Sequence, residues 1–242
     1  IIQGRRSDWV DGGAHQQIFL QTWSPSHAQV KVPWTWIYKI IGLCNSSIDD
    51  IQSMLDVGGE SFLQTYIDEL RAIRVFCYMQ AVNLYGRVPI VTTSKTTVAD
   101  VGQSTRSKGL EFLCTELDAI VANMSNLSGI KSSSEYYGRM TKGAVYAMMA
   151  KVAANAAVWS KDTWNDGTFT GGVEKVGQTV TDLGKAYNIK FEGQTRNAWE
   201  TVIYCQQRLA ELGYKLNPNV KANFSYENEN SVENIFIRPN SP

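Results

Sequence analysis

Residues 139–159 read RMTKGAVYAMMAKVAANAAVW, a stretch in which alanine recurs seven times within one helical pattern. Because alanine side chains are small, the axes of neighbouring helices can approach such a helix closely. We therefore expect this helix to lie at the centre of the packing, with the other elements arranged around it.

Two further helical patterns precede this stretch. Residues 34–57 place apolar side chains at alternating steps of three and four residues, which is typical of one face of a long amphipathic helix. Residues 61–85 predict a second helix that is apolar enough to be buried on most sides. Gly58-Gly59 and Gly86 follow these patterns, and glycine at such positions commonly ends a helix.

The rest of the chain predicts more helix and little strand. We expect helices over residues 105–124 and 196–212, a weaker one over 173–187, and a short extended segment over 88–91. In the last helix, the side chains expected to face inward are Trp199, Val202, Ile203, Gln206 and Leu209.

Antiparallel helices joined by short polar turns favour a mainly α fold. We expect tetratricopeptide-like antiparallel helix pairs with long irregular loops, although the consensus positions of that repeat are missing. Residues 1–242 are expected to form a single domain that is truncated at both ends. Within it, residues 1–33 are predicted to be an irregular segment and residues 160–195 an insertion.

The charge balance argues against several classes of partner. Lys+Arg and Asp+Glu each number 23, so the formal net charge is zero. With no basic excess to neutralise phosphates, nucleic-acid binding is not expected. No polybasic run indicates an anionic membrane surface, and the longest apolar runs fall short of the roughly 18 residues that a membrane span needs.

The residues of common catalytic sites are sparse. His15 and His27 are the only histidines, and no nucleophile elbow, phosphate-binding loop, dinucleotide fingerprint or zinc-protease motif occurs. Asp8 and Asp11 could gather with these histidines around a metal, but their spacing matches no known ligand set. A pair of glycosidase carboxylates facing across a cleft stays open, while ordinary helix-surface charges explain the same residues better. We therefore predict that the chain is not an enzyme.

The cysteines give no metal signal either. They form no C-x-x-C pair and lie within helical patterns, so we interpret them as buried free thiols. A disulfide between two of them stays open, and no cofactor is expected. The four residues are Cys44, Cys77, Cys114 and Cys205.

Seven tryptophans provide the strongest hint of a binding surface. Trp34 and Trp199 fall on apolar helix faces and are expected in the core. An indole left outside the core costs hydration unless it packs on something. Four others lie in loops or at helix ends among polar residues, namely Trp9, Trp23, Trp159 and Trp164.

A sugar ring would suit such indoles, because its apolar C–H face can stack on them while polar side chains take the hydroxyl groups. The alternative for each tryptophan is that it caps the core under a loop. The candidate ligand-binding residues are Trp9, Trp23 and Trp164, with Asp8, Asp11 and His15 as hydroxyl partners.

Two motifs carry a resemblance to a known family. Residues 84–89, LYGRVP, and residues 138–143, GRMTKG, resemble specific blocks of SusD/RagB-type proteins. Four less specific blocks between residues 7 and 238 follow in the same order as in that family. The chain departs from the family in its 160–195 insertion, which is longer than expected, and it lacks the family's C-terminal half.

The resemblance implies a tetratricopeptide-like fold and a non-catalytic, nutrient-binding lipoprotein on the extracellular face of the outer membrane. It implies capture of oligo- or polysaccharides and their delivery to a SusC-like, TonB-dependent importer. Membrane contact would run only through a lipid anchor upstream of Ile1. The alternative is a helical scaffold that binds proteins through its grooves and exposed aromatic residues without contacting sugar.

Overall fold

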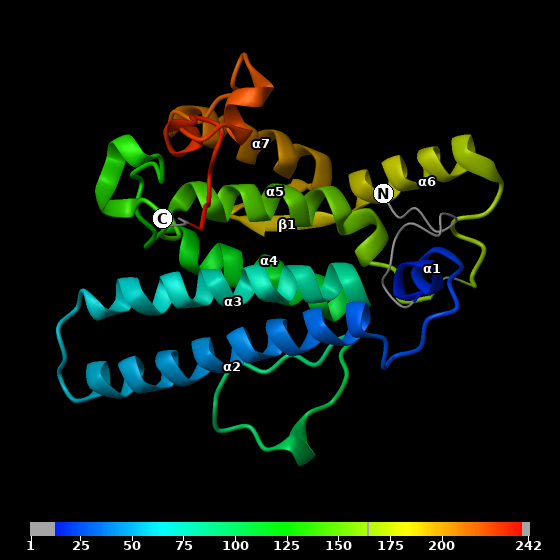
Figure 1. The fold of residues 1–242 in the computed structure, drawn as a ribbon, viewed down its shortest axis with the longest axis horizontal. Coiled ribbons are helices and arrows are strands. Elements are labelled where there is room, and N and C mark those ends of the chain that lie inside the picture. Colours follow the sequence, from blue (N-terminus) through cyan, green and yellow to red (C-terminus); the bar gives the residue numbers. More distant parts are fainter. Residues whose placement is uncertain (1–12, 164, 239–242) are drawn as a thin grey trace.

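The computed structural model describes residues 13–163 and 165–238, without the side chains of 132–134. Helices dominate this part of the chain (Figure 1). The α-helices are α1 (Ala14–Phe19), α2 (Ala28–Asp56), α3 (Leu63–Tyr85), α4 (Arg106–Val121), α5 (Lys142–Trp159), α6 (Gly172–Ala186) and α7 (Ala198–Glu211). Two short strands, β1 (Asn188–Phe191) and β2 (Gln194–Asn197), and four 3-10 turns, Val98–Asp100, Lys131–Tyr136, Val220–Phe224 and Asn228–Asn230, complete the described elements.

The helices stack in order through the molecule. Figure 1 shows α2 and α3 as an antiparallel pair at one side, followed by α4, α5 and α7, with α7 on the far side of α5 from α2. α6 packs against α5 and α7. This arrangement confirms the prediction of a mainly α fold built from antiparallel helix pairs.

The alanine-rich helix α5 lies at the centre, as predicted. It contacts α3, α4, α6 and α7. Its many small side chains allow close approach on several sides, and its buried residues are Gly143, Ala144, Val145, Tyr146, Met148, Met149, Val152, Ala153, Ala156, Ala157 and Trp159. The prediction that Trp159 lies outside the core is therefore wrong: only 4% of it is exposed, because α5 stays within the core up to its last residue.

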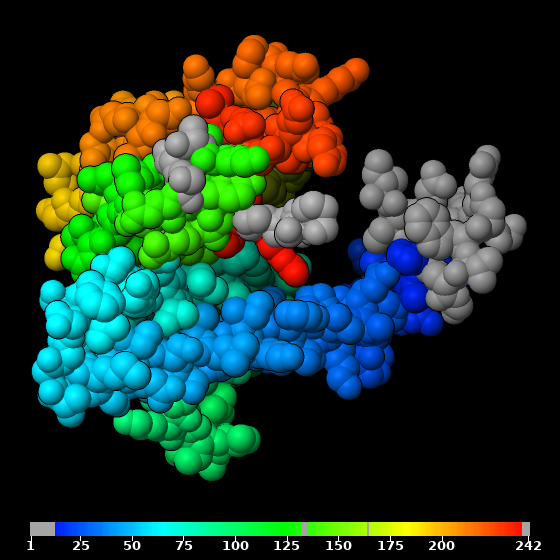
Figure 2. Space-filling model, turned by 60° about the vertical axis from the view of Figure 1, so that its left-hand side comes forward, coloured from blue at the N-terminus to red at the C-terminus, as the bar shows by residue number. Residues whose placement is uncertain are grey.

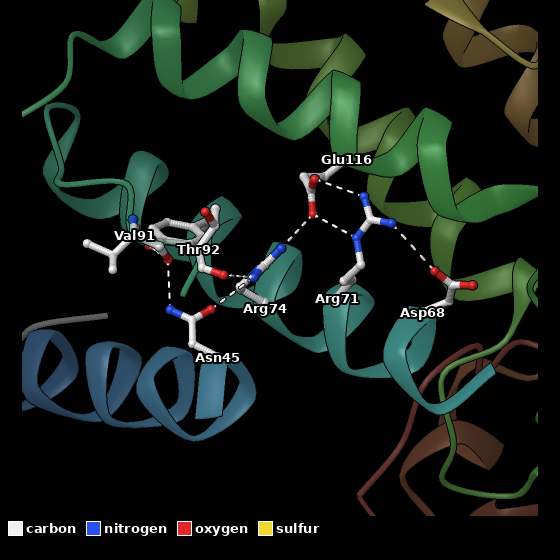
Figure 3. A network of polar contacts seen from close by, with 8 residues as sticks. Asn45, Asp68, Arg71, Arg74, Val91, Thr92 and Glu116 are labelled. Atoms are coloured by element: carbon white, nitrogen blue, oxygen red, sulfur yellow. Dashed lines mark hydrogen bonds and ion pairs between the residues drawn. The ribbon is translucent and has the colours of Figure 1, made fainter. Parts of the chain in front are cut away.

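A buried arginine links α2, α3 and α4 (Figure 3). Arg74 of α3 is 4% exposed and donates hydrogen bonds to Oδ1 of Asn45 at 2.9 Å, to the Thr92 carbonyl at 2.8 Å and to Oε2 of Glu116 at 2.8 Å. Arg71 donates to the other oxygen of the Glu116 carboxylate at 2.9 Å. Since an unpaired buried charge is costly, these contacts fix the spacing of the three helices.

The predicted extended segment at 88–91 lies against the same network. Pro89 forms a single antiparallel bridge with Gln103, so the loop 87–105 doubles back on itself rather than joining a sheet. The hydroxyl of Tyr38 donates to the Pro89 carbonyl at 2.8 Å, and the Tyr78 hydroxyl and the Asn45 amide both donate to the Val91 carbonyl at 2.9 Å. The loop is thus tied to α2 and α3 by side chains.

The prediction that residues 1–33 are irregular is wrong in its second half. Residues 14–19 form α1, and α2 begins at Ala28, six residues before the predicted start. Pro33, the last residue of the segment predicted to be irregular, lies inside α2, where its ring removes one backbone donor near the helix start. His27 caps the helix by accepting from the Gln29 amide at 3.3 Å.

Residues 160–197 contain both a predicted and an unpredicted element. The weak helix expected at 173–187 is confirmed as α6. The antiparallel hairpin of β1 and β2 was not predicted. Its two-residue turn, Glu192-Gly193, has φ values of 51° and 74°, the left-handed pair that suits a tight hairpin.

The inward face predicted for α7 is partly wrong. Ile203 is 57% exposed and Gln206 is also exposed, whereas Ala198, Thr201 and Cys205 are buried against α5. Helix α5 meets α7 along this line of small side chains, which rotates the larger apolar Ile203 outward. Val202 and Leu209 pack against the core as predicted. Trp199 is partly buried against α6 instead, where its indole donates to the Thr181 carbonyl at 2.9 Å.

The structure tests the expectations on thiols, metal sites and membrane spans for the described residues. All four cysteines are free thiols; Cys44, Cys77 and Cys205 are buried and Cys114 is partly so. No group of three or more His, Cys, Asp or Glu residues in 13–163 and 165–238 could hold a metal ion. Within the same ranges, no helix combines the length and apolar character of a membrane span.

We predict opposite effects for two glycine-to-alanine substitutions. A Cβ on Gly143 would lie 2.5 Å from Cε2 of Tyr214, whose buried hydroxyl accepts from the Gly129 amide at 2.9 Å and so cannot retreat. Gly143→Ala should therefore lower the free energy of unfolding by about 1–3 kcal/mol. Gly42, inside α2, has no atom within 4 Å of the same position. Gly42→Ala should instead raise it by about 0.5–1 kcal/mol.

Urea unfolding followed by far-ultraviolet circular dichroism measures both changes. Equal effects of the two substitutions would contradict the close packing of Tyr214 on α5.

Candidate functional site

Only part of the predicted ligand-binding set falls within the described residues. Trp9, Asp8, Asp11 and Trp164 lie outside them, so their positions stay predictions. Trp23 and His15 are described, and both belong to the segment that leads into α2. This segment is therefore the part of the candidate site that the structure can locate.

The segment of α1 and residues 20–27 presents apolar side chains to solvent. Trp23 is 46% exposed, Phe19 is 48% exposed and Leu20 is 55% exposed. Helix α1 has no buried residue, and Figure 2 shows this segment beyond the N-terminal end of α2. We call Phe19, Leu20 and Trp23 the N-terminal aromatic surface.

Local sequence explains why these side chains are held outward. Gly13 begins α1 in the left-handed region at φ 85°, and Gln21 adopts a φ of 56° directly after the helix. These two turns isolate a six-residue helix that is too short to bury a face. Polar groups follow Trp23, with the hydroxyls of Ser24 and Ser26 2.9 Å apart.

Helix α2 carries two tryptophans with opposite environments. Trp34 packs on the core, with its ring centroid 4.5 Å from that of Tyr38 and 5.0 Å from that of Tyr85. Trp36, two positions on, is 59% exposed, and Nζ of Lys39 lies 5.8 Å from its ring centroid. The predicted core position of Trp34 is confirmed, and α2 presents a second exposed indole to solvent.

Other exposed aromatic residues were missed by the sequence analysis. Phe62 and Tyr66 are 57% and 44% exposed at the turn between α2 and α3, with ring centroids 5.9 Å apart. Phe224 and Tyr226 are 83% and 98% exposed near the C-terminal end of the described chain. The Gly58-Gly59 break before Phe62 marked a turn, but no pattern distinguishes an exposed aromatic residue there from a buried one.

The carboxylates that a glycosidase would need are held by structural partners. Glu116 accepts from Arg71 and Arg74; desolvation raises its pKa, but these hydrogen bonds and charges outweigh it and lower the pKa of Glu116. Asp68 accepts from the Asn123 amide at 3.0 Å. Asp49 accepts from the hydroxyl and the amide of Ser94, both at 2.7 Å. Each of these three carboxylates therefore has a structural role in holding helices or loops together.

Comparison with known proteins places the chain in a family. A SusD-like family model, described as starch-binding and associating with the outer membrane, matches residues 4–153. No curated protein matches the sequence.

Solved structures of similar fold give a consistent picture. A laminarin-binding SusD-like protein is 17% identical, with a TM-score of 0.61 over 94% of this chain and 41% of its own. Surface glycan-binding protein A from Bacteroides uniformis is 19% identical, with a TM-score of 0.63 over 92% and 41%. A structure with xylogluco-oligosaccharide is 18% identical, with a TM-score of 0.62 over 95% and 38%.

The chain spans about two fifths of the length of these structures. At such low identity the likeness establishes the fold alone, whereas the family match covers more than half of the 242 residues. The chain therefore belongs to the SusD-like family, as its LYGRVP and GRMTKG motifs indicated.

Proposed function

We propose that the chain is a non-catalytic carbohydrate-binding protein that captures oligo- or polysaccharide at its N-terminal aromatic surface. The observation that carries this proposal is the exposure of Trp23, which follows a helix, α1, that has no buried residue. The family's starch-binding description supports the ligand class, as do the ligands of two structural neighbours, laminarin and a xylogluco-oligosaccharide.

The chemistry of this surface suits a sugar ring. An exposed indole offers an apolar plane to the C–H face of a pyranose, and the contact removes apolar area of both partners from water. Hydroxyl groups of Ser24 and Ser26 and the imidazole of His15 lie on the same segment, where they can meet the sugar hydroxyls. Trp9, Trp164, Asp8 and Asp11 complete the set in this proposal.

Location and partner follow from the family in the same proposal. The protein would be lipid-anchored at the extracellular face of the outer membrane and would pass its glycan to a SusC-like, TonB-dependent transporter. Its formal net charge of zero fits neutral glycans, which place no charge at the site.

A second candidate function is protein binding, which the exposed side of α2 favours. Val32, Trp36 and Leu43 are 53%, 59% and 61% exposed, and their spacing places them on one face of the helix. Exposed tryptophan with flanking aliphatic side chains is common at protein interfaces. In a SusD-like protein this face could serve a protein partner while the N-terminal aromatic surface holds sugar.

Substitution of Trp23 tests the proposed site. Trp23→Ala should weaken retention of the protein in native gels that contain starch, laminarin or xyloglucan by at least about tenfold in affinity, which corresponds to ~1.4 kcal/mol. The fold should persist, because α1 contributes no buried residue to the core. Tyr226→Ala, which removes an aromatic ring that is 98% exposed elsewhere, is the matched control and should retain binding.

If Trp23→Ala binds all three glycans as tightly as the unaltered protein, the N-terminal aromatic surface is not the site. If the unaltered protein binds none of them while a barrel partner raises its melting temperature, the protein-binding alternative replaces the proposal.

A further inference from the structure

A shallow hollow is formed by side chains of β2 and α7. Helix α7 lies on the side of α5 that faces away from α2 (Figure 1). The hollow encloses about 380 Å³, at the small end of the range for ligand sites. One side chain comes from β2 and the other four recur on one face of the helix, at steps of three or four residues from Glu200 to Gln207. The lining residues are Arg196, Glu200, Ile203, Tyr204 and Gln207.

The wall of this hollow is held rigid by a network beneath it. The Arg196 guanidinium lies over the Tyr204 ring, 3.8 Å from its centroid, and donates to Oε1 of Gln194 at 2.6 Å. The Tyr204 hydroxyl donates to Glu192 at 2.6 Å, and the Tyr146 hydroxyl donates to the same carboxylate at 3.0 Å. Because these groups fix one another, Arg196 and Tyr204 lose little freedom when a ligand binds.

The polar groups available to a ligand in the hollow include a cation, a carboxylate and an amide. Arg196 has five N–H donors, of which those to Gln194 and to the Phe191 carbonyl are engaged. Glu200 uses one carboxylate oxygen to accept from the Asn197 amide, which leaves the other for a ligand. The Gln207 side chain lines the hollow from α7, and its amide offers both a donor and an acceptor.

The apolar part is small and central. Ile203 is 57% exposed between the polar side chains, where it presents methyl groups rather than a broad apolar face. A protein partner of ordinary affinity needs roughly 800 Å² on each side, far more than this patch offers. One cation and one carboxylate balance each other, so neither an anion nor a cation is favoured as ligand. A neutral molecule with many hydroxyl groups and an apolar C–H face fits both features.

We propose that the hollow formed by Arg196, Glu200, Ile203, Tyr204 and Gln207 is a second carbohydrate site, which binds one end or one short stretch of a neutral saccharide. The Ile203 side chain contacts the C–H face of a sugar ring, while Arg196, Glu200 and Gln207 bond its hydroxyl groups. The Tyr204 ring supports the guanidinium and does not stack on sugar, since Arg196 covers one face and the edge-on Phe191 ring lies 6.4 Å away.

This site is separate from the N-terminal aromatic surface, and the test keeps the two apart. Titrations with maltose, cellobiose and laminaribiose are followed by nuclear magnetic resonance on protein carrying Trp23→Ala. The Ile203 methyl groups and the Gln207 side-chain amide should shift saturably with at least one disaccharide. Ile203→Ser combined with Gln207→Ala should weaken that binding at least tenfold.

Gln206→Ala is the matched control, because Gln206 is an exposed glutamine on the same helix that does not line the hollow. It should leave the affinity unchanged. Absence of shifts at Ile203 and Gln207 with all three sugars would overturn the second site, whatever Trp23 does in the unaltered protein. Equal losses in the Gln206→Ala protein and in the protein that combines Ile203→Ser with Gln207→Ala would also overturn it, because a general effect on α7 would then explain both.

Discussion

The buried contact between Arg74 and Glu116 is the constraint on which the layered arrangement depends. Arg74 lies in α3, yet it bonds Asn45 of α2, Glu116 of α4 and the carbonyl of Thr92 in the 87–105 loop. A charge buried in this way is tolerated only when its partners are in place, so the helices cannot slide without exposing or orphaning it. Apolar packing supplies most of the stability, and this network fixes the register of the packing.

That register determines which side chains reach solvent on the two sides of the molecule. At the α2 side, Trp34 is held against Tyr38 and Tyr85, which leaves Trp36 and the preceding segment with Trp23 outside the core. At the opposite side, the small residues of α5 admit α7 along its Ala198–Cys205 line, which turns Ile203 outward into the hollow. The hollow on α7 is thus a consequence of how the core is packed, whereas the N-terminal aromatic surface follows from the short helix α1, which buries no residue.

The sequence predicted the ends of α2 and α3 well, where a long periodic pattern was followed by a glycine break, and it predicted α5 from its run of alanines. It failed where tertiary packing overruled the local pattern. Residues 28–33 were predicted to be irregular but belong to α2, and Trp159 was placed outside a core that α5 fills to its end. The β1–β2 hairpin is too short to show a period. The Arg74 network could not be predicted, because Glu116 lies 42 residues from Arg74 in the sequence and no local pattern indicates that the two side chains meet. Of the candidate site, composition indicated exposed indoles, and Trp23 is one, but the hollow on α7 needed the rotation of that helix.

A double-mutant cycle between Arg74 and Glu116 tests the constraint most directly. We expect Arg74→Met and Glu116→Gln each to lower the free energy of unfolding by about 3–5 kcal/mol. The first removes the bonds of Arg74 to Asn45, Thr92 and Glu116, and the second leaves the buried Arg74 without its carboxylate partner. The loss in the free energy of unfolding of the double variant should be smaller than the sum of the two single losses by at least about 1 kcal/mol. Losses that add to within about 0.5 kcal/mol would mean that the two side chains act independently, and the contact would then not set the arrangement of the helices.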